Sequence, residues 1–501
     1  MEALQKTIYF STDSGQVMRK TKPLQVLQEK DLTKVVESKV LGIYPDYTYQ
    51  TVEGFGCAMT ETACYLLSKM SPETRKEALS CWFGPDGMNA QFIRMHIDSC
   101  DYSLTEYQAV EDPIEDPELK TLNIERDKKY MIPVVKEAMA LAEHPLSILL
   151  SPWSPPKQWK TPPELSQNDA QVYGGMGQQV DLTKPGRCFG GRLKPEFYGA
   201  WAKYLVKYIK LYLAEGLNVT MLSIQNEASA ATNWDSCLWS AAQEKEFLQH
   251  YLYPAMKAEG LTDKIEIFIW DHNKERMIEH IDDMMDDTTM QMVSGFAYHW
   301  YSGDHFEALQ MMHEHYPDKI LMHSESCGLH VPGKTTAFEI TEESKKHMPP
   351  EFLSLVDMNP LEMDFNDAVA YAHDLIGDIN HGMQRWIDWN LCVDRTGGPR
   401  HVPGGFAAPI VAEDDGSFSK TVSFAYLELI AKTVKRDAVR IGSSLYGADV
   451  EAAAVKNPDD SIGIIILNSH DEDVQINIRM KGQLCTADIP AKTLSSIIIE
   501  K

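Results

Sequence analysis

The sequence lacks any uninterrupted apolar run of about 18 residues, which is the length that a membrane-spanning helix needs. Its first residues, MEALQKTIYFSTDSGQV, show no basic region followed by an apolar segment, so we expect no secretion signal and a cytoplasmic location. Low-complexity tracts and short repeats are also missing. With a hydrophobic content of 44%, these absences indicate an ordinary globular chain.

Positive charge is scarce relative to negative charge. The 501 residues include 47 Lys and Arg against 73 Asp and Glu, which gives a formal net charge of −26. A surface of that sign repels polyphosphate, so the composition argues against nucleic acid or an anionic membrane as a partner. The acidic residues are spread along the chain, and we interpret them as favouring solubility.

Paired cysteine spacings are missing as well. The nine cysteines are scattered, at positions 57, 64, 81, 100, 188, 237, 327, 392 and 485. They lack the short spacings of metal ligands, so we expect free thiols in a reducing compartment. His299, His323 and Cys327 show no metal-ligand spacing either, and we expect hydrogen-bonding roles for them. The sequence therefore implies neither a metal nor a cofactor.

Between about residues 46 and 437 the chain alternates between β-rich runs and segments of helical period. The β-rich runs cover residues 51–61, 90–98, 146–153, 218–227, 264–272, 294–301, 319–326 and 385–393. The helical segments carry start signals, such as Ser71 before Pro72 in SPETRKEALSCWF. Eight such units predict an α/β fold, a (β/α)8 TIM barrel, more readily than an open sheet.

The two chain ends, residues 1–45 and 438–501, have a different pattern. Short strands separated by polar turns are expected at 450–457, 461–469, 474–480 and 493–500. Neither end alone is long enough for a full β-sandwich. We therefore expect the N-terminal strands to complete a discontinuous β-sandwich with the C-terminal ones.

Two of the predicted barrel strands end in a carboxylate. Glu227 follows MLSIQN at the end of the fourth strand, and Glu325 ends the seventh in LMHSE. A lone acid at such a place is commonly a strand end that emerges into solvent. In a barrel, however, these ends form the active-site mouth, and strands four and seven lie on opposite sides of it. Facing carboxylates are what retaining glycoside hydrolysis requires, with chance placement as the alternative.

Other polar and aromatic residues gather at the same strand ends. Asn226 could donate to a sugar 2-hydroxyl, and Tyr301 could keep Glu325 ionised by donating to it. The further candidates are Arg94 as a charge partner, Asp101 for sugar hydroxyls, His299, and Trp153, Trp386 and Trp389 for stacking on a pyranose ring. Plain core packing is the alternative for each tryptophan.

The barrel region carries seven motifs in order. They are GFGCAMTETACYLL, IRMHIDSCDYS, LSPWSPPKQWKT, LSIQNEASA, FAYHWYSGD, HSESCG and WIDWNLCVDRTGGP. Together they resemble glycoside hydrolase family 30, which includes the glucosylceramidases and has a discontinuous β-sandwich. The resemblance implies that Glu227 is the general acid/base and Glu325 the nucleophile, and it adds Asn390 to the residues around the glycone. Ala228 departs from the family pattern, which has proline there.

These observations predict an exo-acting retaining β-glycosidase that works by double displacement. The resemblance implies a β-glucosidase acting on small β-glucosides or oligosaccharides, with β-xylosidase or β-1,6-glucanase as alternatives within the family. In the free enzyme Glu325 should be ionised and Glu227 protonated. A non-catalytic sugar-binding protein on a barrel scaffold stays open, because one fold hosts many functions. A homo-oligomer is also compatible with the sequence.

A glycine-rich segment, residues 173–195, carries Lys184, Arg187, Arg192 and Lys194 in an otherwise acidic chain. An anionic aglycone or a sugar phosphate could bind the basic stretch 184–194. We expect instead a rim loop whose charges are solvated. Its glycines do not match the motifs that cradle phosphate.

Overall fold

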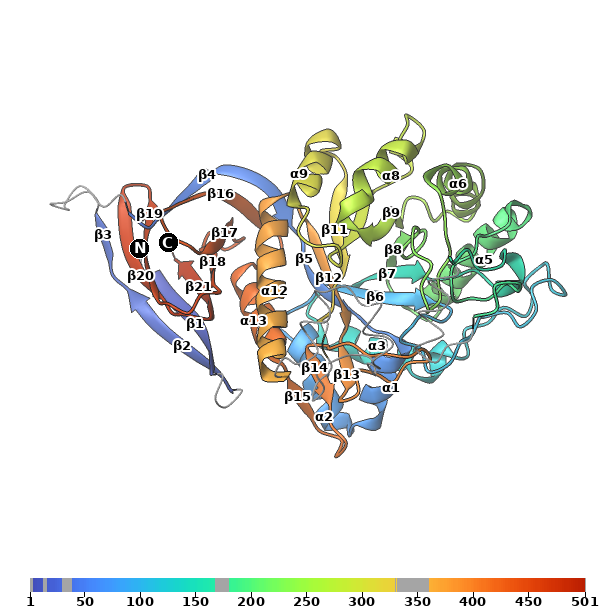
Figure 1. The fold of residues 1–501 in the computed structure, drawn as a ribbon, viewed down its shortest axis with the longest axis horizontal. Coiled ribbons are helices and arrows are strands. Elements are labelled where there is room, and N and C mark those ends of the chain that lie inside the picture. Colours follow the sequence, from blue (N-terminus) through green and yellow to red (C-terminus); the bar gives the residue numbers. More distant parts are fainter. Residues whose placement is uncertain are drawn as a thin grey trace.

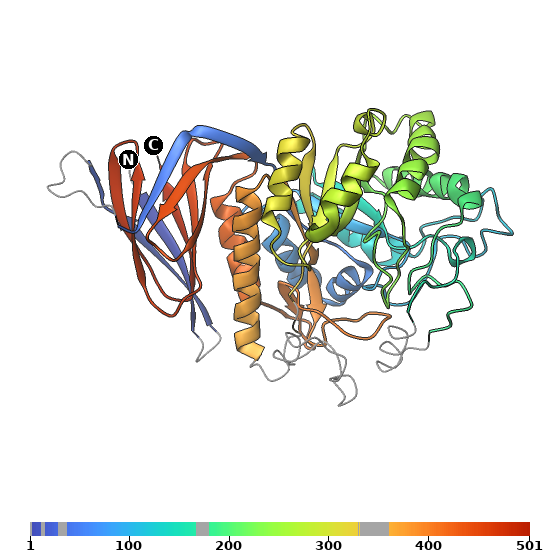
Figure 2. The same cartoon turned by 45° about the horizontal axis from the view of Figure 1, so that its top comes forward.

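The computed structural model describes residues 3–11, 16–28, 38–166, 180–328, 330 and 360–500. Figure 1 shows two parts, a barrel surrounded by helices and a group of β-strands that holds both chain ends. Helices α12 (Pro360–Asn380) and α13 (Val422–Thr433) stand between them (Figures 1 and 2). No helix within the described ranges is long and apolar enough to cross a membrane.

Eight parallel strands close the barrel, each paired with the next along the chain and the last with the first. They are β5 (Gly54–Ala58), β6 (Phe92–Ile97), β7 (Ser147–Pro152), β8 (Val219–Ser223), β9 (Glu266–Asn273), β10 (Gly295–His299), β11 (Ile320–Glu325) and β12 (Arg385–Asn390). Each overlaps one predicted run, so the predicted (β/α)8 barrel is confirmed. The eighth run breaks at Leu391, and a short strand, β13 (Cys392–Asp394), follows and pairs with β14 (Ile410–Ala412).

The barrel interior is packed with side chains. Seven strands contribute one residue each to a buried cluster of Phe92, Leu149, Met221, Phe268, Ala297, Met322 and Ile387. Arg385 lies at the amino-terminal end of the barrel. Its guanidinium is 5.6 Å from the ring centroid of Phe92 and forms ion pairs with Glu53 and Glu266. A filled barrel leaves the carboxyl ends of the strands as the place for a ligand.

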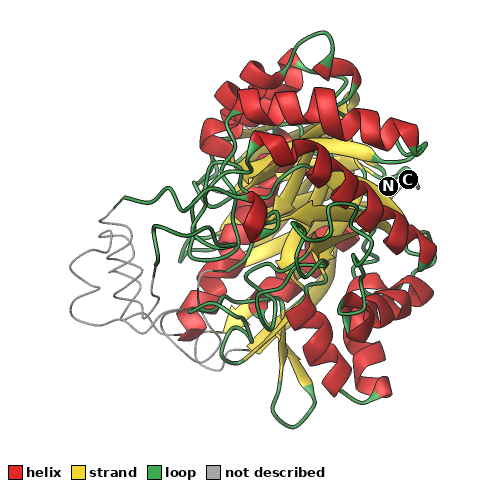
Figure 3. Ribbon diagram, turned by 90° about the vertical axis from the view of Figure 1, so that its right-hand side faces the viewer, coloured by secondary structure: helices red, strands yellow, loops and turns green. Residues whose placement is uncertain are grey.

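Helices surround the barrel strands, as the outer red layer in Figure 3 shows. They bury apolar side chains in the core that they share with the barrel. They are α1 (Glu61–Lys69), α2 (Pro72–Phe83), α3 (Met131–Leu141), α5 (Tyr198–Ala214), α6 (Ala241–Phe247), α7 (Tyr253–Ala258), α8 (Met277–Met284) and α9 (Phe306–His315). As predicted, Ser71 caps α2: its side chain accepts from the Thr74 N–H, and Pro72 opens the first turn. Gly216 and Gly260, which follow α5 and α7, adopt φ values of +83° and +65°.

The second part is built from both chain ends. Its strands are β1 (Ala3–Ser11), β2 (Gln16–Leu24), β3 (Val26–Gln28), β4 (Val40–Val52), β16 (Ala438–Tyr446), β17 (Glu451–Lys456), β18 (Ile462–Asn468), β19 (Val474–Met480), β20 (Gln483–Ile489) and β21 (Thr493–Ile499). β1 pairs with β21, and β4 pairs with β16, so the discontinuous β-sandwich is confirmed. Its buried core is rich in isoleucine. β4 runs on to Val52 and leads directly into the barrel (Figure 1).

Candidate active site

The carboxyl ends of the barrel strands meet around a cavity of about 260 Å³, here called the mouth cavity. It is lined by Asp101, Trp153, Glu227, Ala230, Thr232, Trp234, His272, Asn273, Tyr301, Glu325, Cys327, Trp389 and Phe406. The two carboxylates that the sequence places at strand ends therefore share one cavity. Neither is a strand end in open solvent, because Glu227 and Glu325 are each only 7% exposed.

Glu227 reaches the mouth cavity on a tight turn after β8. Its φ is +52°, a conformation that costs a non-glycine residue of order 1–3 kcal/mol. Hydrogen bonds to both neighbouring strands hold the turn. The Glu227 N–H donates to the Asp271 carbonyl at 2.9 Å, and the Asn226 N–H donates to the Pro152 carbonyl at 2.9 Å. Backbone strain of this kind at a buried acid is the observation from which a functional role can be inferred.

Glu325 ends β11 and is held by two donors. Arg94 Nη1 donates to its Oε2 at 2.5 Å, and the Tyr301 hydroxyl donates to its Oε1 at 3.1 Å. The Arg94 side chain is fully buried, and its Nη2 also donates to Asn226 Oδ1 at 2.8 Å. Arg94 therefore links the loops that carry the two acids. This is the charge-partner role that the sequence predicts for it.

Asp271, at the end of β9, is a third carboxylate beside Arg94. It was not among the predicted site residues. Its carboxylate accepts from Arg94 Nη2 at 2.8 Å, from Ser223 at 2.6 Å and from Ser324 at 2.6 Å. Burial acts to raise the pKa of Asp271, but Arg94, His299 and Ser223 hold it well below its usual range. The sequence signal was the polar ending WDHN on an otherwise apolar strand.

Two histidines flank Glu227. His299 Nε2 lies 3.1 Å from Asp271 Oδ1, and its Nδ1 lies 3.4 Å from Glu227 Oε1. Burial acts to lower the pKa of His299, but Glu325, Asp271 and Glu227 together raise it to about 9. Burial lowers the pKa of His272 to about 4, with Glu227 opposing and the charge on His299 adding to the effect. At neutral pH, therefore, His299 is charged and His272 is neutral.

The charge on His299 changes the balance between the two acids. Burial would raise the pKa of Glu227, but the adjacent His299 and His272 lower it. Burial raises the pKa of Glu325, against the opposing charges of His299 and Arg94. The expected order, with Glu227 the protonated acid of the free enzyme, is therefore not the order of these pKa values. The positive charge of His299 beside Glu227 is one cause of this lowered pKa, and the sequence could not show it.

One wall of the mouth cavity is aromatic. Trp153 and Trp389 stack on each other with ring centroids 5.2 Å apart and planes at 28°. Asp101 lies beside them, and Arg400 Nη2 donates to its Oδ2 at 2.9 Å. Burial raises the pKa of Asp101 to about 7, with Arg400 opposing. This wall offers a stacking surface and a carboxylate that can accept from hydroxyl groups.

Five predicted binding residues do not line the cavity: Arg94, Asn226 and His299, which contact the two acids or each other, and Trp386 and Asn390. Trp386 is 1% exposed and packs against Phe55 and Tyr371, at centroid distances of 6.2 and 6.1 Å, in the layer between barrel and helices. Strand alternation explains this, because its neighbour Ile387 points into the barrel. Trp386 is thus a core residue, and the stacking role predicted for it is wrong. Asn390 is buried behind the cavity, where its Oδ1 accepts from Thr60 at 2.6 Å.

Comparison with known families agrees with this geometry. The glycosyl hydrolase family 30 TIM-barrel domain matches residues 52–337 and 356–432, and the family 30 beta sandwich domain matches residues 437–497. The chain belongs to glycosyl hydrolase family 30. It is a glycoside hydrolase, and this finding argues against the alternative of a non-catalytic sugar-binding protein.

Relatives within family 30 carry different names. Lysosomal acid glucosylceramidase of Mus musculus is 26% identical over 455 residues, which are 88% of this chain and 79% of that protein. Endo-1,6-beta-D-glucanase neg1 of Aspergillus fumigatus is 23% identical over 462 residues, 90% of this chain and 85% of that protein. Among solved structures, SrfJ from Salmonella typhimurium shares the whole fold, with a TM-score of 0.83, 27% identity and full coverage of both chains.

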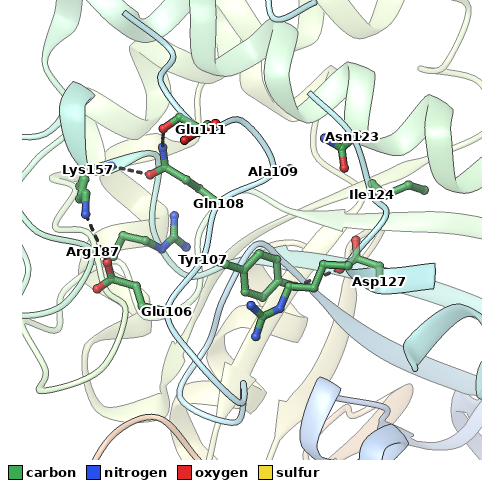
Figure 4. A pocket seen from close by; sticks show the side chains of 11 residues that line it. Glu106, Tyr107, Gln108, Ala109, Glu111, Asn123, Ile124, Asp127, Lys157 and Arg187 are labelled. Carbon is green, nitrogen blue, oxygen red and sulfur yellow. Dashed lines mark hydrogen bonds and ion pairs between the residues drawn. The ribbon is translucent and has the colours of Figure 1, made fainter. Parts of the chain in front are cut away.

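A second cavity of the family 30 barrel, of about 390 Å³, lies beside the loop 106–127 (Figure 4). Two of its cations already pair with carboxylates. Lys157 lies 3.7 Å from Glu106, and Arg126 binds Glu61 at 2.8 Å. Because these charges neutralise one another, we place the reaction in the mouth cavity.

The basic stretch 184–194 is partly buried. Arg187 is 1% exposed and lies 2.8 Å from Asp235 and 3.5 Å from Asp98, so the prediction of solvated charges is wrong for it. Both carboxylates lie far away in sequence, which hid the pairing. Lys184 is 80% exposed, as expected. The start of the glycine-rich segment, residues 173–179, lies outside the described residues.

Three groups in the described part of the chain bring potential metal ligands together. They are Cys188, Asp235 and His401; Glu227, His272 and His299; and His323, Asp374 and Asp378. Two of them already hold a protein cation, because Arg187 lies 2.8 Å from Asp235 and Lys274 lies 2.6 Å from Asp374. The other group surrounds the acid of the mouth cavity. That the reaction needs no metal stays a prediction, which an assay with a chelator tests.

Proposed function

We propose that the protein is an exo-acting β-glucosidase that hydrolyses small β-glucosides with net retention. The observation that carries the proposal is that Glu227 and Glu325 line one small cavity closed by Trp153 and Trp389. Its volume of about 260 Å³ lies below the range of about 300–1,000 Å³ usual for drug-sized ligands. That size favours one terminal sugar over a polymer threaded through the site.

The reaction follows from the two carboxylates. Glu325 attacks C1 and forms an ester as the bond from C1 to the leaving oxygen breaks, while Glu227 gives that oxygen a proton. Glu227 then takes a proton from water, which attacks C1 and frees Glu325. Arg94 and Tyr301 hold the Glu325 carboxylate in one orientation through both of its oxygens. Positioning of this kind supplies a large part of enzymatic rate enhancement.

The proton for the leaving group is shared between Glu227 and His299. With His299 Nδ1 at 3.4 Å from Glu227 Oε1, transfer between them needs little movement. Asp271 fixes the other ring nitrogen, so the shared proton faces the acid. A bound substrate excludes water beside Glu227, and the loss of water disfavours charged groups. It therefore favours the state in which Glu227 is protonated and His299 is neutral.

His299→Gln tests this sharing. In the wild type the pair keeps its proton up to the pKa of His299, about 9, so the basic limb of kcat/KM is expected there. Glutamine can still donate to Asp271 but holds no titratable proton. The basic limb should then move down toward the pKa of Glu227 itself. The profile is measured with methyl β-glucoside and with 2,4-dinitrophenyl β-glucoside, whose leaving group needs no acid. If the basic limb of kcat/KM for methyl β-glucoside is the same in His299→Gln as in the wild type, the proposal that Glu227 and His299 share the proton is contradicted.

Substrate preference is tested with p-nitrophenyl β-D-glucoside, xyloside, fucoside, galactoside and glucuronide. The glucoside is expected to give the highest kcat/KM, with no loss when a chelator is added. Dominance of the xyloside would favour β-xylosidase instead. Activity on none of the five would contradict a β-glycosidase with an ordinary glycone.

Endo action on β-1,6-glucan is the second candidate, because the Aspergillus fumigatus relative bears that name. Incubation with a β-1,6-glucan distinguishes the two. Exo action releases glucose from the first time point, whereas endo action releases a ladder of oligosaccharides. Cytoplasmic location and oligomeric state stay predictions, which cell fractionation and sizing of the purified protein address.

A further inference from the structure

His272 is a buried imidazole without hydrogen bonds. It lines the mouth cavity, is 4% exposed, and neither of its ring nitrogens has a partner among the described residues. Leaving a buried donor or acceptor unpaired is costly, and native proteins rarely do so without a reason. The reason can be a ligand that supplies the missing partners.

Thr232 presents a second unpaired group in the same cavity. Its hydroxyl is buried and has no hydrogen-bond partner within the described ranges, although the residue lines the cavity. Thr232 belongs to the loop that follows Glu227, and His272 Nδ1 lies 3.7 Å from Glu227 Oε1. His272 therefore lies beside the acid, and Thr232 belongs to the loop that follows the acid and lines the same cavity.

The position of His272 beside Glu227 determines which part of the substrate it contacts. In the proposed reaction Glu227 protonates the leaving oxygen, so the leaving group lies next to Glu227. His272, 3.7 Å from Glu227, is then next to the leaving group, and Thr232 approaches it from the loop that follows Glu227. Trp234 and Phe406, which also line the cavity, add aromatic surface.

We infer that His272 and Thr232 form a leaving-group subsite for a hydroxylated aglycone, such as a second sugar, and select against an aliphatic one. A neutral imidazole offers one donor and one acceptor, and a threonine hydroxyl offers both. Sugar hydroxyls supply both complements, whereas an alkyl chain supplies neither. The inference rests on the proposed function, because it needs Glu227 to act on the leaving oxygen.

The subsite is built for neutral hydroxyl groups. Burial lowers the pKa of His272 to about 4 and keeps the imidazole neutral, and the charges that act on it come from Glu227, His299, Glu275 and Arg276. Arg187, in the basic stretch, is engaged by Asp235 and Asp98. An anionic aglycone would thus find no matching charge in His272.

His272→Phe keeps the ring and removes both nitrogens. Gentiobiose and n-octyl β-glucoside are the paired substrates, because both leave as primary alcohols and need similar help from the acid. The ratio of kcat/KM for gentiobiose to that for octyl β-glucoside should fall about ten- to a hundredfold. Thr232→Val should lower the same ratio by a smaller factor, and Thr232→Ser should restore it.

His280→Phe is the matched control. His280 also packs on Trp270, with a centroid distance of 4.9 Å against 5.2 Å for His272, but it binds Glu244 and does not line the cavity. Its variant should leave the ratio unchanged.

Three results would overturn the inference. An equal loss on both substrates means that His272 acts through Glu227, and an unchanged ratio means that it touches no leaving group. A wild type that prefers octyl β-glucoside to every disaccharide contradicts a hydroxylated aglycone. If the wild type cleaves neither these substrates nor p-nitrophenyl β-glucoside, the proposed function fails instead.

Discussion

Replacing Glu325 with alanine should lower kcat/KM by about 10⁴-fold or more, a barrier increase of about 5.5 kcal/mol or more. Without this carboxylate no ester forms at C1, and no other acid of the cavity is held by both Arg94 and Tyr301. Azide can enter the vacated space and attack C1 directly. The expected product is the α-glucosyl azide, identified by its anomeric proton in NMR.

Glu325→Gln, whose stability is measured, is the folding control for loss of this carboxylate. Burial raises the pKa of Glu325, so the folded state binds the proton more tightly than the unfolded chain. The ionised group therefore destabilises the fold above that pKa, and Glu325→Gln should unfold at the same or a higher temperature than the wild type. A β-azide, or activity near the wild-type level, would contradict the nucleophile assignment.

Replacing Glu227 with alanine should slow hydrolysis of poor leaving groups about 10²–10⁴-fold, or about 3–5 kcal/mol of barrier. Glycosides with an activated leaving group, such as 2,4-dinitrophenyl, should lose little in the first step because they leave without a proton. The ester at Glu325 then accumulates, since no base activates water. Azide, which needs no base, should release it as the β-glucosyl azide and restore turnover.

Leaving-group dependence is the decisive readout for Glu227. The comparison uses kcat/KM for methyl and 2,4-dinitrophenyl β-glucosides on the same preparation. Equal losses on both would contradict the acid/base role, and so would an α-azide.

Local sequence patterns predicted what depends on neighbouring residues. The eight strands were found from apolar runs, and Glu227 and Glu325 from the acids that end two of them. The barrel topology then brought these ends together, since parallel strands finish on one side. Both acids, with Asp101, Trp153, Tyr301 and Trp389, line the cavity.

The remaining features depend on packing between distant segments. Trp386 and Trp389 occupy similar sequence contexts. Their side chains lie on opposite faces of β12, so one packs in the core and the other lines the cavity. Arg187 finds Asp98 and Asp235 across the fold. His272 and its free nitrogens are visible only once the burial of its surroundings is known.

Trapping the covalent intermediate tests the central claim most directly. The wild type is incubated with 2-deoxy-2-fluoro-β-D-glucosyl fluoride, digested, and the labelled peptide is sequenced by mass spectrometry. The account predicts one fluoroglucosyl group per chain, attached to Glu325. A label on another residue would contradict the assignment of the nucleophile. Turnover of β-glucosides to α-glucose, with no label formed, would contradict the double displacement itself.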